Sequence, residues 1–571
     1  MFVKVTRQKH ADYEYQKVLI AESFRENGRV KHRTLAYLGQ MSQKDLDNLI
    51  RGLNKLKEKP FDLDASQDKL LRPMQYGTVQ AVEHFFERAG IGAIIDAAQR
   101  DRKIQFDLAP YVRLMVINRM VAPKSKLGLC EWFPEAHVPG LHKLEYHKLL
   151  RTLTYLDEMK NGIEERLYET TTRHLFSGEV DLVFFDATST YFEGRGPESL
   201  ALRGYSRDKR PDCYQVVIVV AVNRDGLPIG HEVWEGNMAD KKTVVPMLRR
   251  LKERFDIRRC VFVGDRGMTS AANVKALRAE GYEVILALKK RRLRESREAI
   301  EADLKKYRVH TRLEASYHKG RQIVEEKEAF LYLEHPADAE GYRRIVCHTR
   351  DVALQENARL EEKLNMSRTR VKEILENGNT AARKLKALAS VRRLGRYFDW
   401  GQQPDGRVFC RENKNKTEFE RTLCGKYVLK TDTNLPPQDV IHTYKQLQLV
   451  EDGFRDLKSF LEVQPIHHHK EENVRGHIFV CVLSLYVSRL MELQSVQAGK
   501  PRTAESIMKT LSSMKLIERQ LAGRTFGQSI EPTHEQKALF NTLGMNTPPK
   551  LVELKPIEVV RPPQRYEMSK M

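Results

Sequence analysis

Two aspartates follow apolar segments that are predicted to be strands, and both could bind a metal. The stretch "DLVFFDATSTYF" at 181–192 places four apolar residues before Asp186, and "RCVFVGDRG" at 259–267 repeats the arrangement before Asp265. In an open α/β sheet, functional groups gather just beyond the carboxyl ends of strands. Two carboxylates at one sheet edge repel each other unless a cation lies between them, and carboxylate oxygens suit magnesium or manganese. The pair therefore predicts a divalent-metal site.

A third acid is predicted on the helical segment at 444–462, "YKQLQLVEDGFRDLKSFLE". One face of this segment is apolar and consists of Val450, Phe454, Leu457 and Leu461. The next face, at helical spacings, consists of Tyr444, Leu447, Glu451, Arg455 and Lys458. A carboxylate can bind a metal ion, and a neighbouring tyrosine and cations can bind phosphate, so this face suits a site that does both. Glu451 is therefore the predicted third acid.

Two other interpretations of this segment stay open. Glu451–Arg455 and Lys458–Glu462 could be ordinary ion pairs between residues four apart, which would fit the spacing equally well. Asp452 could be the acid instead of Glu451. It ranks second because it lies about 100° around the helix from Glu451, off the face described above.

Other residues capable of chemistry have plainer explanations. The histidines of "HHHKEENVRGH" could bind a transition metal, but three adjacent side chains cannot all face one ion from a regular element. Loop residues, or imidazoles beside a phosphate, are the preferred interpretation of His467, His468, His469 and His477. Ser189 lacks a Gly-x-Ser-x-Gly elbow, so we expect it to cap a strand end rather than act as a nucleophile. Asp240 is expected to cap the next helix, with a place near the active site as the alternative.

The elements that position these residues can be predicted from the hydrophobic period. Residues 179–290 follow the order β-β-β-α-β-α-β, which predicts a mixed α/β layer. Residues 291–433 contain charged helices and strand-like pieces, "GRVFC" and "GKYVLKTD", and are expected to be an insertion. The other expected elements are strands over 1–40 with a turn at Asn27-Gly28, a helix capped by Ser42, helices over 77–176, and one helix over 504–521.

The composition narrows the class of protein. The 571-residue chain carries 98 Lys and Arg against 77 Asp and Glu, and its net charge of +21 favours a polyanionic partner such as nucleic acid. No C-x-x-C pair occurs among the seven cysteines, so no zinc ribbon is expected, and scattered cysteines fit the cytoplasm. The N-terminal residues "MFVKVTRQKH" do not have the pattern of a signal peptide, so none is expected. The longest apolar run, 478–487, is about half of a membrane span, which predicts a core helix.

The chain resembles the DDE transposases of bacterial insertion sequences. The branch is the one with an insertion in its RNase H-like core and a third motif of Tyr-x2-Arg-x3-Glu-x6-Lys. The resemblance is carried by "FFDATSTYFEG", "VGDRGM" and "YKQLQLVEDGFRDLK", and it extends over nearly the whole chain, including "GNMADKKT" and "NRMVAPKSK". Leu447 stands where the motif has arginine. A phosphate contact expected there is in doubt, and Arg455 is the candidate to replace it.

The resemblance implies an α/β fold, in which an RNase H-like mixed-sheet catalytic core is interrupted by an α+β insertion and preceded by a hairpin and a helical region. It implies that Asp186, Asp265 and Glu451 hold two Mg²⁺ or Mn²⁺ ions, with Asp186 binding both. Water would cleave the phosphodiester bond at the element ends, and the freed 3′-hydroxyl would attack target DNA. The expected DNA-binding residues are Tyr444, Lys458, Arg455 and Arg266.

Six regions are expected on this interpretation. They are an N-terminal hairpin and helix (1–60), a helical DNA-binding region (61–178), the first part of the catalytic core (179–290), the insertion (291–433), the helical second part of the core (434–500), and a C-terminal helix and tail (501–571).

The expected partners are double-stranded DNA with terminal inverted repeats, target DNA and a second copy of the chain, in the cytoplasm and with no membrane. The alternatives are a catalytically inactive DNA-binding protein of the same fold and an RNase H-like nuclease without strand transfer.

Overall fold

A computed structural model of the chain describes most of its residues. The described ranges are 2–10, 13–26, 29–39, 45–50, 68–100, 102–172, 181–255, 260–264, 270–290, 294–318, 321–521 and 524–562. The predicted turn at Asn27-Gly28 and the predicted cap Ser42 lie outside these ranges, as do Asp265 and Arg266.

The centre of the molecule is a mixed sheet with the strand order β8-β7-β6-β9-β10. These strands are β6 (Asp181–Tyr191), β7 (Gln215–Val222), β8 (Pro228–Glu235), β9 (Cys260–Gly264) and β10 (Glu283–Ala287), with α7 (Asp240–Phe255) and α8 (Ala271–Ala279) between them in sequence. The first three strands are antiparallel, whereas β6, β9 and β10 are parallel. This topology confirms the predicted order of elements and the RNase H-like α/β fold.

Both faces of this sheet are covered, which explains its uninterrupted apolar strands. All eight residues of β7 are buried. Val217, Val219 and Ala221 pack with α7 in one cluster, whereas Val216 and Ile218 belong to the main core on the opposite face. The alternation follows from the two-residue repeat of a strand.

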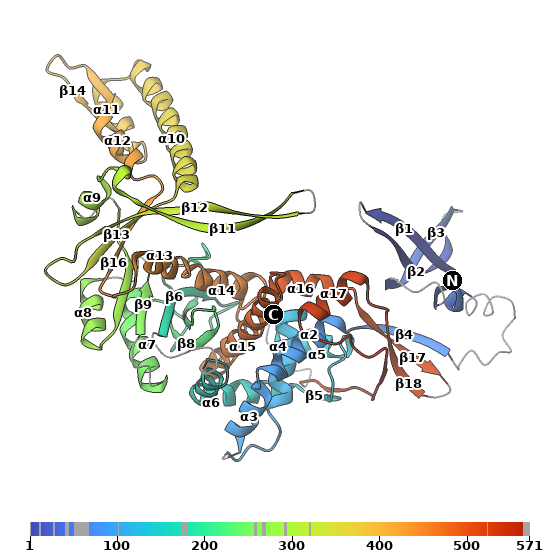
Figure 1. The fold of residues 1–571 in the computed structure, drawn as a ribbon. Helices are drawn as coiled ribbons and strands as arrows, with labels where there is room; N and C mark the ends of the chain where they lie inside the picture. The colour runs from blue at the N-terminus through green and yellow to red at the C-terminus, as the bar shows by residue number, and fades with distance from the viewer. Residues whose placement is uncertain are drawn as a thin grey trace.

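The insertion extends the same sheet before it forms a separate part. Its sheet strands are β11 (Arg308–His318), β12 (Arg321–His335), β13 (Arg343–His348) and β16 (Lys426–Thr431), and β16 pairs antiparallel with β10 to make nine strands in all. The separate part consists of α10 (Arg350–Glu376), α11 (Ala381–Ser390), β14 (Phe398–Gln402), β15 (Val408–Glu412) and α12 (Lys414–Thr422), around its own small core. In Figure 1 this part and the β11–β12 ribbon both project from the body of the molecule. The predicted strand-like pieces "GRVFC" and "GKYVLKTD" correspond to β15 and β16.

A helical body packs against the core sheet. Its N-terminal elements are α2 (Gly77–Arg88), α3 (Ile91–Gln99), α4 (Ala109–Val121), α5 (Lys126–Trp132), β5 (Lys143–Glu145) and α6 (Tyr146–Thr172). From the C-terminal half come α13 (Pro437–Lys445), α14 (Gln448–Ser459) and α15 (Glu471–Gln497). Before them in the chain, β1 (Phe2–His10), β2 (Tyr13–Glu26) and β3 (Arg29–Gly39) form a separate antiparallel sheet, and residues 45–50 are helical.

The prediction of one helix over 504–521 was wrong. The helix α16 (Ala504–Leu511) stops early, and the second half of the segment is the strand β17 (Lys515–Leu521). It pairs with β4 (Asp68–Gln75) and β18 (Arg524–Ser529), and β19 (Leu551–Glu553) completes a four-stranded sheet. The partner β4 lies over 400 residues earlier, inside the region expected to be helical, so local propensity is overridden by a long-range pairing. The remaining C-terminal elements are α17 (His534–Thr542) and β20 (Glu558–Val560).

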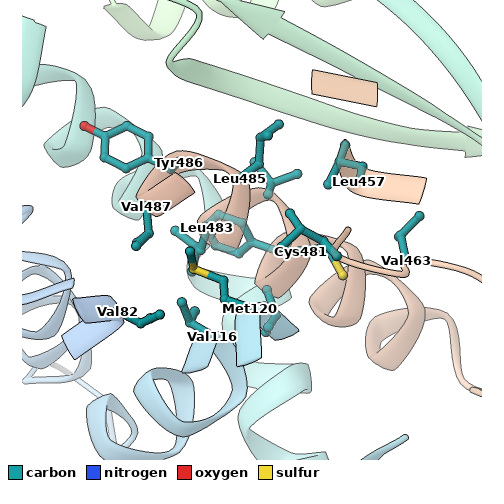
Figure 2. Packing of buried hydrophobic residues seen from close by; sticks show 14 of the residues in the cluster. Val82, Val116, Met120, Leu457, Val463, Cys481, Leu483, Leu485, Tyr486 and Val487 are labelled. Carbon is teal, nitrogen blue, oxygen red and sulfur yellow. The ribbon is translucent and has the colours of Figure 1, made fainter. Parts of the chain in front are cut away.

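The predicted core helix at 478–487 is confirmed as part of α15. Figure 2 shows Leu483 and Val487 of α15 close to Val116 and Met120 of α4. Within the described residues, α15 has the length and hydropathy to cross a membrane, but 83% of its apolar window is buried inside the protein. Its Gly476 allows a close approach to α6, since an added Cβ would lie 2.1 Å from the carbonyl oxygen of Leu153.

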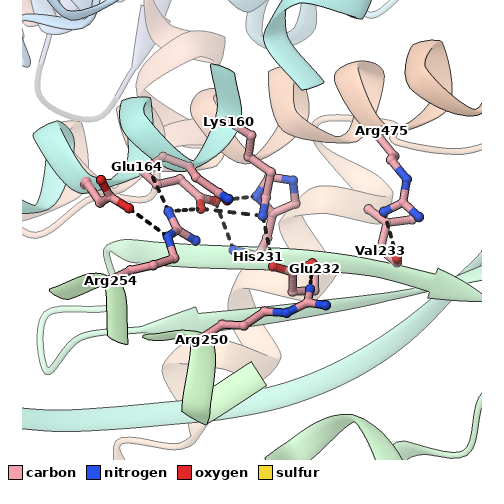
Figure 3. A network of polar contacts seen from close by, with 10 residues as sticks. Lys160, Glu164, His231, Glu232, Val233, Arg250, Arg254 and Arg475 are labelled. Carbon is pink, nitrogen blue, oxygen red and sulfur yellow. Dashed lines mark hydrogen bonds and ion pairs between the residues drawn. The ribbon is translucent and has the colours of Figure 1, made fainter. Parts of the chain in front are cut away.

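A buried polar network joins α6 to the edge strand β8 (Figure 3). Glu164 of α6 accepts hydrogen bonds from the backbone N–H of His231 at 3.0 Å and contacts its Nδ1 at 2.7 Å. Arg254 of α7 donates to the same carboxylate at 3.0 Å. Burial would raise the pKa of Glu164, but Lys160, His231 and Arg254 together lower it to about 2. The network therefore contains a permanently ionised glutamate.

Candidate active site

Asp186 is half-buried and lies within β6, not beyond the end of the strand as expected, because β6 continues to Tyr191 in its pairing with β7. Its neighbour across the antiparallel pair is Val220 of β7, and the parallel strand β9 lies on the other side. The Oδ1 atom of Asp186 accepts a hydrogen bond from the backbone N–H of Ala187 at 2.8 Å. The buried residues around it, such as Phe185 and Ala187, hold this part of the strand in place. The carboxylate is therefore positioned by the centre of the sheet.

Glu451 lies in the first turn of α14 and is exposed. The predicted apolar stripe is confirmed, because Val450, Phe454, Leu457 and Leu461 are all buried in the main core. Through this stripe α14 packs against the sheet and contacts both β6 and β7. The structure thus brings the element that carries Glu451 against the element that carries Asp186.

Asp265 and Arg266 lie outside the described residues. The last described residue of β9 is Gly264, and Val263 is paired with Phe184 of β6. No group of three His, Cys, Asp or Glu side chains able to hold a metal occurs within the described ranges, which contain only two of the three predicted ligands. The four histidines at 467–477 are all described, and they form no such group.

The third-motif segment is not one helix, as predicted, but two. The helix α13 ends at Lys445, and α14 begins at Gln448. Tyr444 therefore belongs to α13, where its ring lies 5.7 Å from that of Tyr427. Leu447 sits in the turn and is 6% exposed, packed in the main core. Leu447 therefore packs in the core where the family motif has arginine, and its side chain does not lie on the exposed face that carries Glu451.

The two cations on α14 form ion pairs. The Nζ atom of Lys458 lies 2.7 Å from Oδ1 of Asp208, and both side chains are largely buried. Arg455 pairs with Asp452 at 2.8 Å, and Gln448 donates to the same carboxylate at 3.1 Å. Asp452, the second-ranked acid, is thus engaged by its helical neighbours. Sequence reasoning missed Asp208, because it lies 250 residues before Lys458 in a loop without a motif.

The structure also shows where Ser189 and Asp240, two weaker candidates from the sequence, are located. Ser189 is 1% exposed, and its Oγ accepts a hydrogen bond from the backbone N–H of Arg207 at 3.2 Å. The residue thus ties a loop to β6, in keeping with a structural role. Asp240 is the first residue of α7.

Comparison with known proteins defines the class. A family model described as "Transposase DDE domain" matches residues 179–487, which is more than half of the chain. The protein therefore belongs to the DDE transposase family, as the motifs and the sheet topology indicated. Residues 3–67 match the model "IS1634 family transposase, N-terminal domain", which points to the insertion-sequence branch.

Curated proteins and solved structures do not define the family any further. No curated protein matches the chain. One similar solved structure is a "Mos1 transposase paired-end complex with left transposon end", with 13% sequence identity and a TM-score of 0.14 over 42% of this chain and 66% of that chain. The chain thus spans 66% of the length of that structure. The family assignment rests on the sequence matches.

Proposed function

We propose that this transposase cleaves DNA at the ends of an insertion sequence and joins the freed ends to target DNA, in a reaction that depends on divalent metal. The observation that carries the proposal is the contact between β6, which bears Asp186, and α14, which bears Glu451. Both lie inside the segment that matches the DDE domain. Asp265, which follows Gly264 of the adjacent strand β9, is proposed as the third ligand.

The donor set suits Mg²⁺ or Mn²⁺. The proposed ligands are all carboxylates, the hard oxygen donors that these ions prefer. Two ions bound there would activate the attacking oxygen and stabilise the leaving oxygen of a phosphodiester. The family resemblance implies that Asp186 would contact both ions. Asp265 and Glu451 would each bind one.

The remaining chemistry needs no covalent protein intermediate. Water would attack the phosphodiester bond at the element end and break it into a 3′-hydroxyl and a 5′-phosphate. The 3′-hydroxyl would then attack a phosphodiester of the target and displace a 3′-hydroxyl of the target strand. Lys458 is proposed to hold a backbone phosphate once it has exchanged its partner Asp208. Tyr444, Arg455 and Arg266 are the other proposed DNA contacts. Arg455 is 64% exposed, so it is accessible to DNA.

The whole-molecule proposals follow from the reaction. The N-terminal 178 residues are proposed to bind the terminal inverted repeats, and two copies of the chain would hold the two ends together. The net charge of +21 fits a protein that binds double-stranded DNA in the bacterial cytoplasm.

The test is strand cleavage by purified full-length variants on a labelled DNA fragment that contains the element end. Asp186→Asn, Asp265→Asn and Glu451→Gln should each lower the cleavage rate by more than about 100-fold, because even residues that only support metal ligands typically contribute 10–100-fold. Gel-shift binding to the same DNA should persist. Asp452→Asn is the matched control and should retain cleavage. EDTA should abolish cleavage by the wild type.

Each outcome separates the alternatives. Normal cleavage by any one of the three variants removes that residue from the site. Cleavage by Glu451→Gln together with loss in Asp452→Asn would transfer the role to Asp452. A pre-cut end that is never joined to target DNA would favour a nuclease without strand transfer. DNA binding without cleavage under any metal would favour an inactive DNA-binding protein.

A further inference from the structure

A small cavity lies between the start of α5 and the segment that follows α14. Its volume is about 140 Å³, and its lining includes Arg119, Lys126, Glu462, His468 and His477. Lys124 and Glu462, which also line it, are exposed, whereas Lys126 is buried, so the cavity opens to solvent above a buried floor. A cavity of this size holds several water molecules. It is therefore large enough for a tetrahedral oxyanion.

Two buried cations reach this cavity. Lys126 is 4% exposed, and its ammonium has no hydrogen bond or ion pair within the described part of the chain. Arg119 is 5% exposed. Its Nη atoms donate to backbone carbonyls of Glu462 at 3.0 Å and Lys124 at 2.7 Å, but its Nε has no partner among the described residues. Burial, with Arg119 adding to the effect, lowers the pKa of Lys126 to about 7.

Two imidazoles complete the floor. The rings of His468 and His477 lie 5.4 Å apart. His477 is 4% exposed, its Nε2 contacts the carbonyl oxygen of Val463 at 3.1 Å, and its Nδ1 is buried with no partner among the described residues. Burial lowers the pKa of both histidines, and the neighbouring Arg119 and Lys126 lower it further. Both imidazoles are therefore neutral near pH 7, and the positive charge of the cluster resides on Arg119 and Lys126, which repel each other.

No buried acid balances these charges within the described lining. Glu462 is the one carboxylate among those lining residues, and it is exposed. The charged or titratable neighbours that act on Lys126 are Arg119 and the thiol of Cys481. Burial raises the pKa of that thiol, so it stays neutral and supplies no counter-charge. A buried cation without a partner costs several kcal/mol, which an anionic ligand would offset.

We propose that this cavity binds a phosphate group, which Lys126 and Arg119 contact directly, and that in the working protein it is a backbone phosphate of the DNA. The second part rests on the proposed function. Arg119 also holds the carbonyl of Leu461, at 3.4 Å, just beyond the end of α14. Ten residues separate Leu461 from Glu451, or about 15 Å at helical rise. This separation is short enough for one bound DNA duplex to contact both places.

The first arm of the test uses inorganic phosphate and the full-length protein without DNA. Sodium phosphate should raise the melting temperature of the wild type above its value in sodium chloride of equal ionic strength, because a ligand of the folded state stabilises it. Lys126→Met should lose this shift. It should fold at least as stably as the wild type without phosphate, since it removes a buried unpaired charge. Lys126→Gln is a second variant that should also lose the shift. Lys500→Met, which removes an exposed lysine elsewhere, is the matched control and should keep it.

The second arm measures DNA binding as a function of salt. The slope of log K against log salt concentration should fall by about 1 in Lys126→Met, because one phosphate contact is lost. A smaller slope in this variant supports DNA as the source of the phosphate. Loss of the phosphate shift with an unchanged slope keeps the phosphate site but overturns the DNA assignment. No shift in the wild type and an unchanged slope overturn the proposal. The first arm needs neither metal nor cleavage, so its result is independent of the catalytic assignment.

Discussion

Lys458, a proposed DNA contact, is held in place by a carboxylate. Asp208 lies 2.7 Å from its ammonium, and the two side chains are only 16% and 18% exposed. The ion pair orients the lysine, and a phosphate that bound Lys458 as proposed would have to displace the carboxylate. Asp208 therefore competes with the proposed ligand for the same cation.

Asp208→Asn should raise the affinity for the element end by about 3- to 10-fold, because breaking the ion pair costs on the order of 1 kcal/mol. Fluorescence anisotropy with a labelled end fragment would measure this change. Asp212→Asn is the control, since Asp212 pairs with Arg210 in the same loop and its loss changes the net charge equally. An equal gain in both variants would mean that net charge alone, and not release of Lys458, determines the affinity.

At the scale of elements, the joint between α6 and β8 depends on Glu164. The carboxylate is buried and ionised, and it contacts His231, Arg254 and Lys160. Since β8 is the edge strand of the core sheet, this network fixes the helical body to the catalytic core. Glu165 of α6 also pairs with Arg254, at 3.1 Å, but it is 38% exposed, so removal of the Glu164 charge would leave the buried cations with fewer partners.

Glu164→Gln should lower the free energy of unfolding by about 3 kcal/mol, the usual cost of removing one partner from a buried ion pair. Glu158→Gln, on the same helix, breaks an exposed pair with Arg102 and should cost less than about 1 kcal/mol. Urea unfolding followed by circular dichroism would compare the two. Equal losses would show that burial of the network contributes nothing to stability.

At the scale of the whole molecule, the insertion presents a basic groove away from the candidate active site. The groove has a volume of about 710 Å³ and lies between α10 and residues 391–397. The cations that line it include Arg359, Lys363, Arg392, Arg393 and Arg396. Arg393 adopts a φ of +66°, a conformation rare for residues with side chains, which indicates that the surrounding turn holds it there. We expect this groove to follow a DNA backbone.

The double variant Arg359→Glu with Lys363→Glu should weaken DNA binding by more than about 10-fold and reduce the salt slope by about 2. Arg383→Glu with Lys386→Glu, on α11 and outside the groove, applies the same change of charge. It should have a clearly smaller effect on gel-shift titrations at several salt concentrations. Similar losses in both would point to long-range charge rather than contact in the groove.

The sequence by itself determined the mixed α/β core and the family. The uninterrupted apolar runs before Asp186 and Asp265 and the apolar stripe on α14 are local consequences of burial on two faces or one, so they can be read without coordinates. The motifs around the three acids identified the family. What they could not determine is which side chains meet across long separations in the chain.

Only the tertiary structure determined which distant residues contact each other. Residues 515–521 became a strand because β4, from the far end of the chain, offered a pairing edge. The turn between α13 and α14 separated Tyr444 from Glu451, and Asp208 reached Lys458 from a distant loop. The buried pair of Arg119 and Lys126 met the loop after α14 in the same way. Each of these contacts is stabilised by residues that lie far away in the chain. Local propensity depends only on neighbouring residues, so the sequence alone did not predict these contacts.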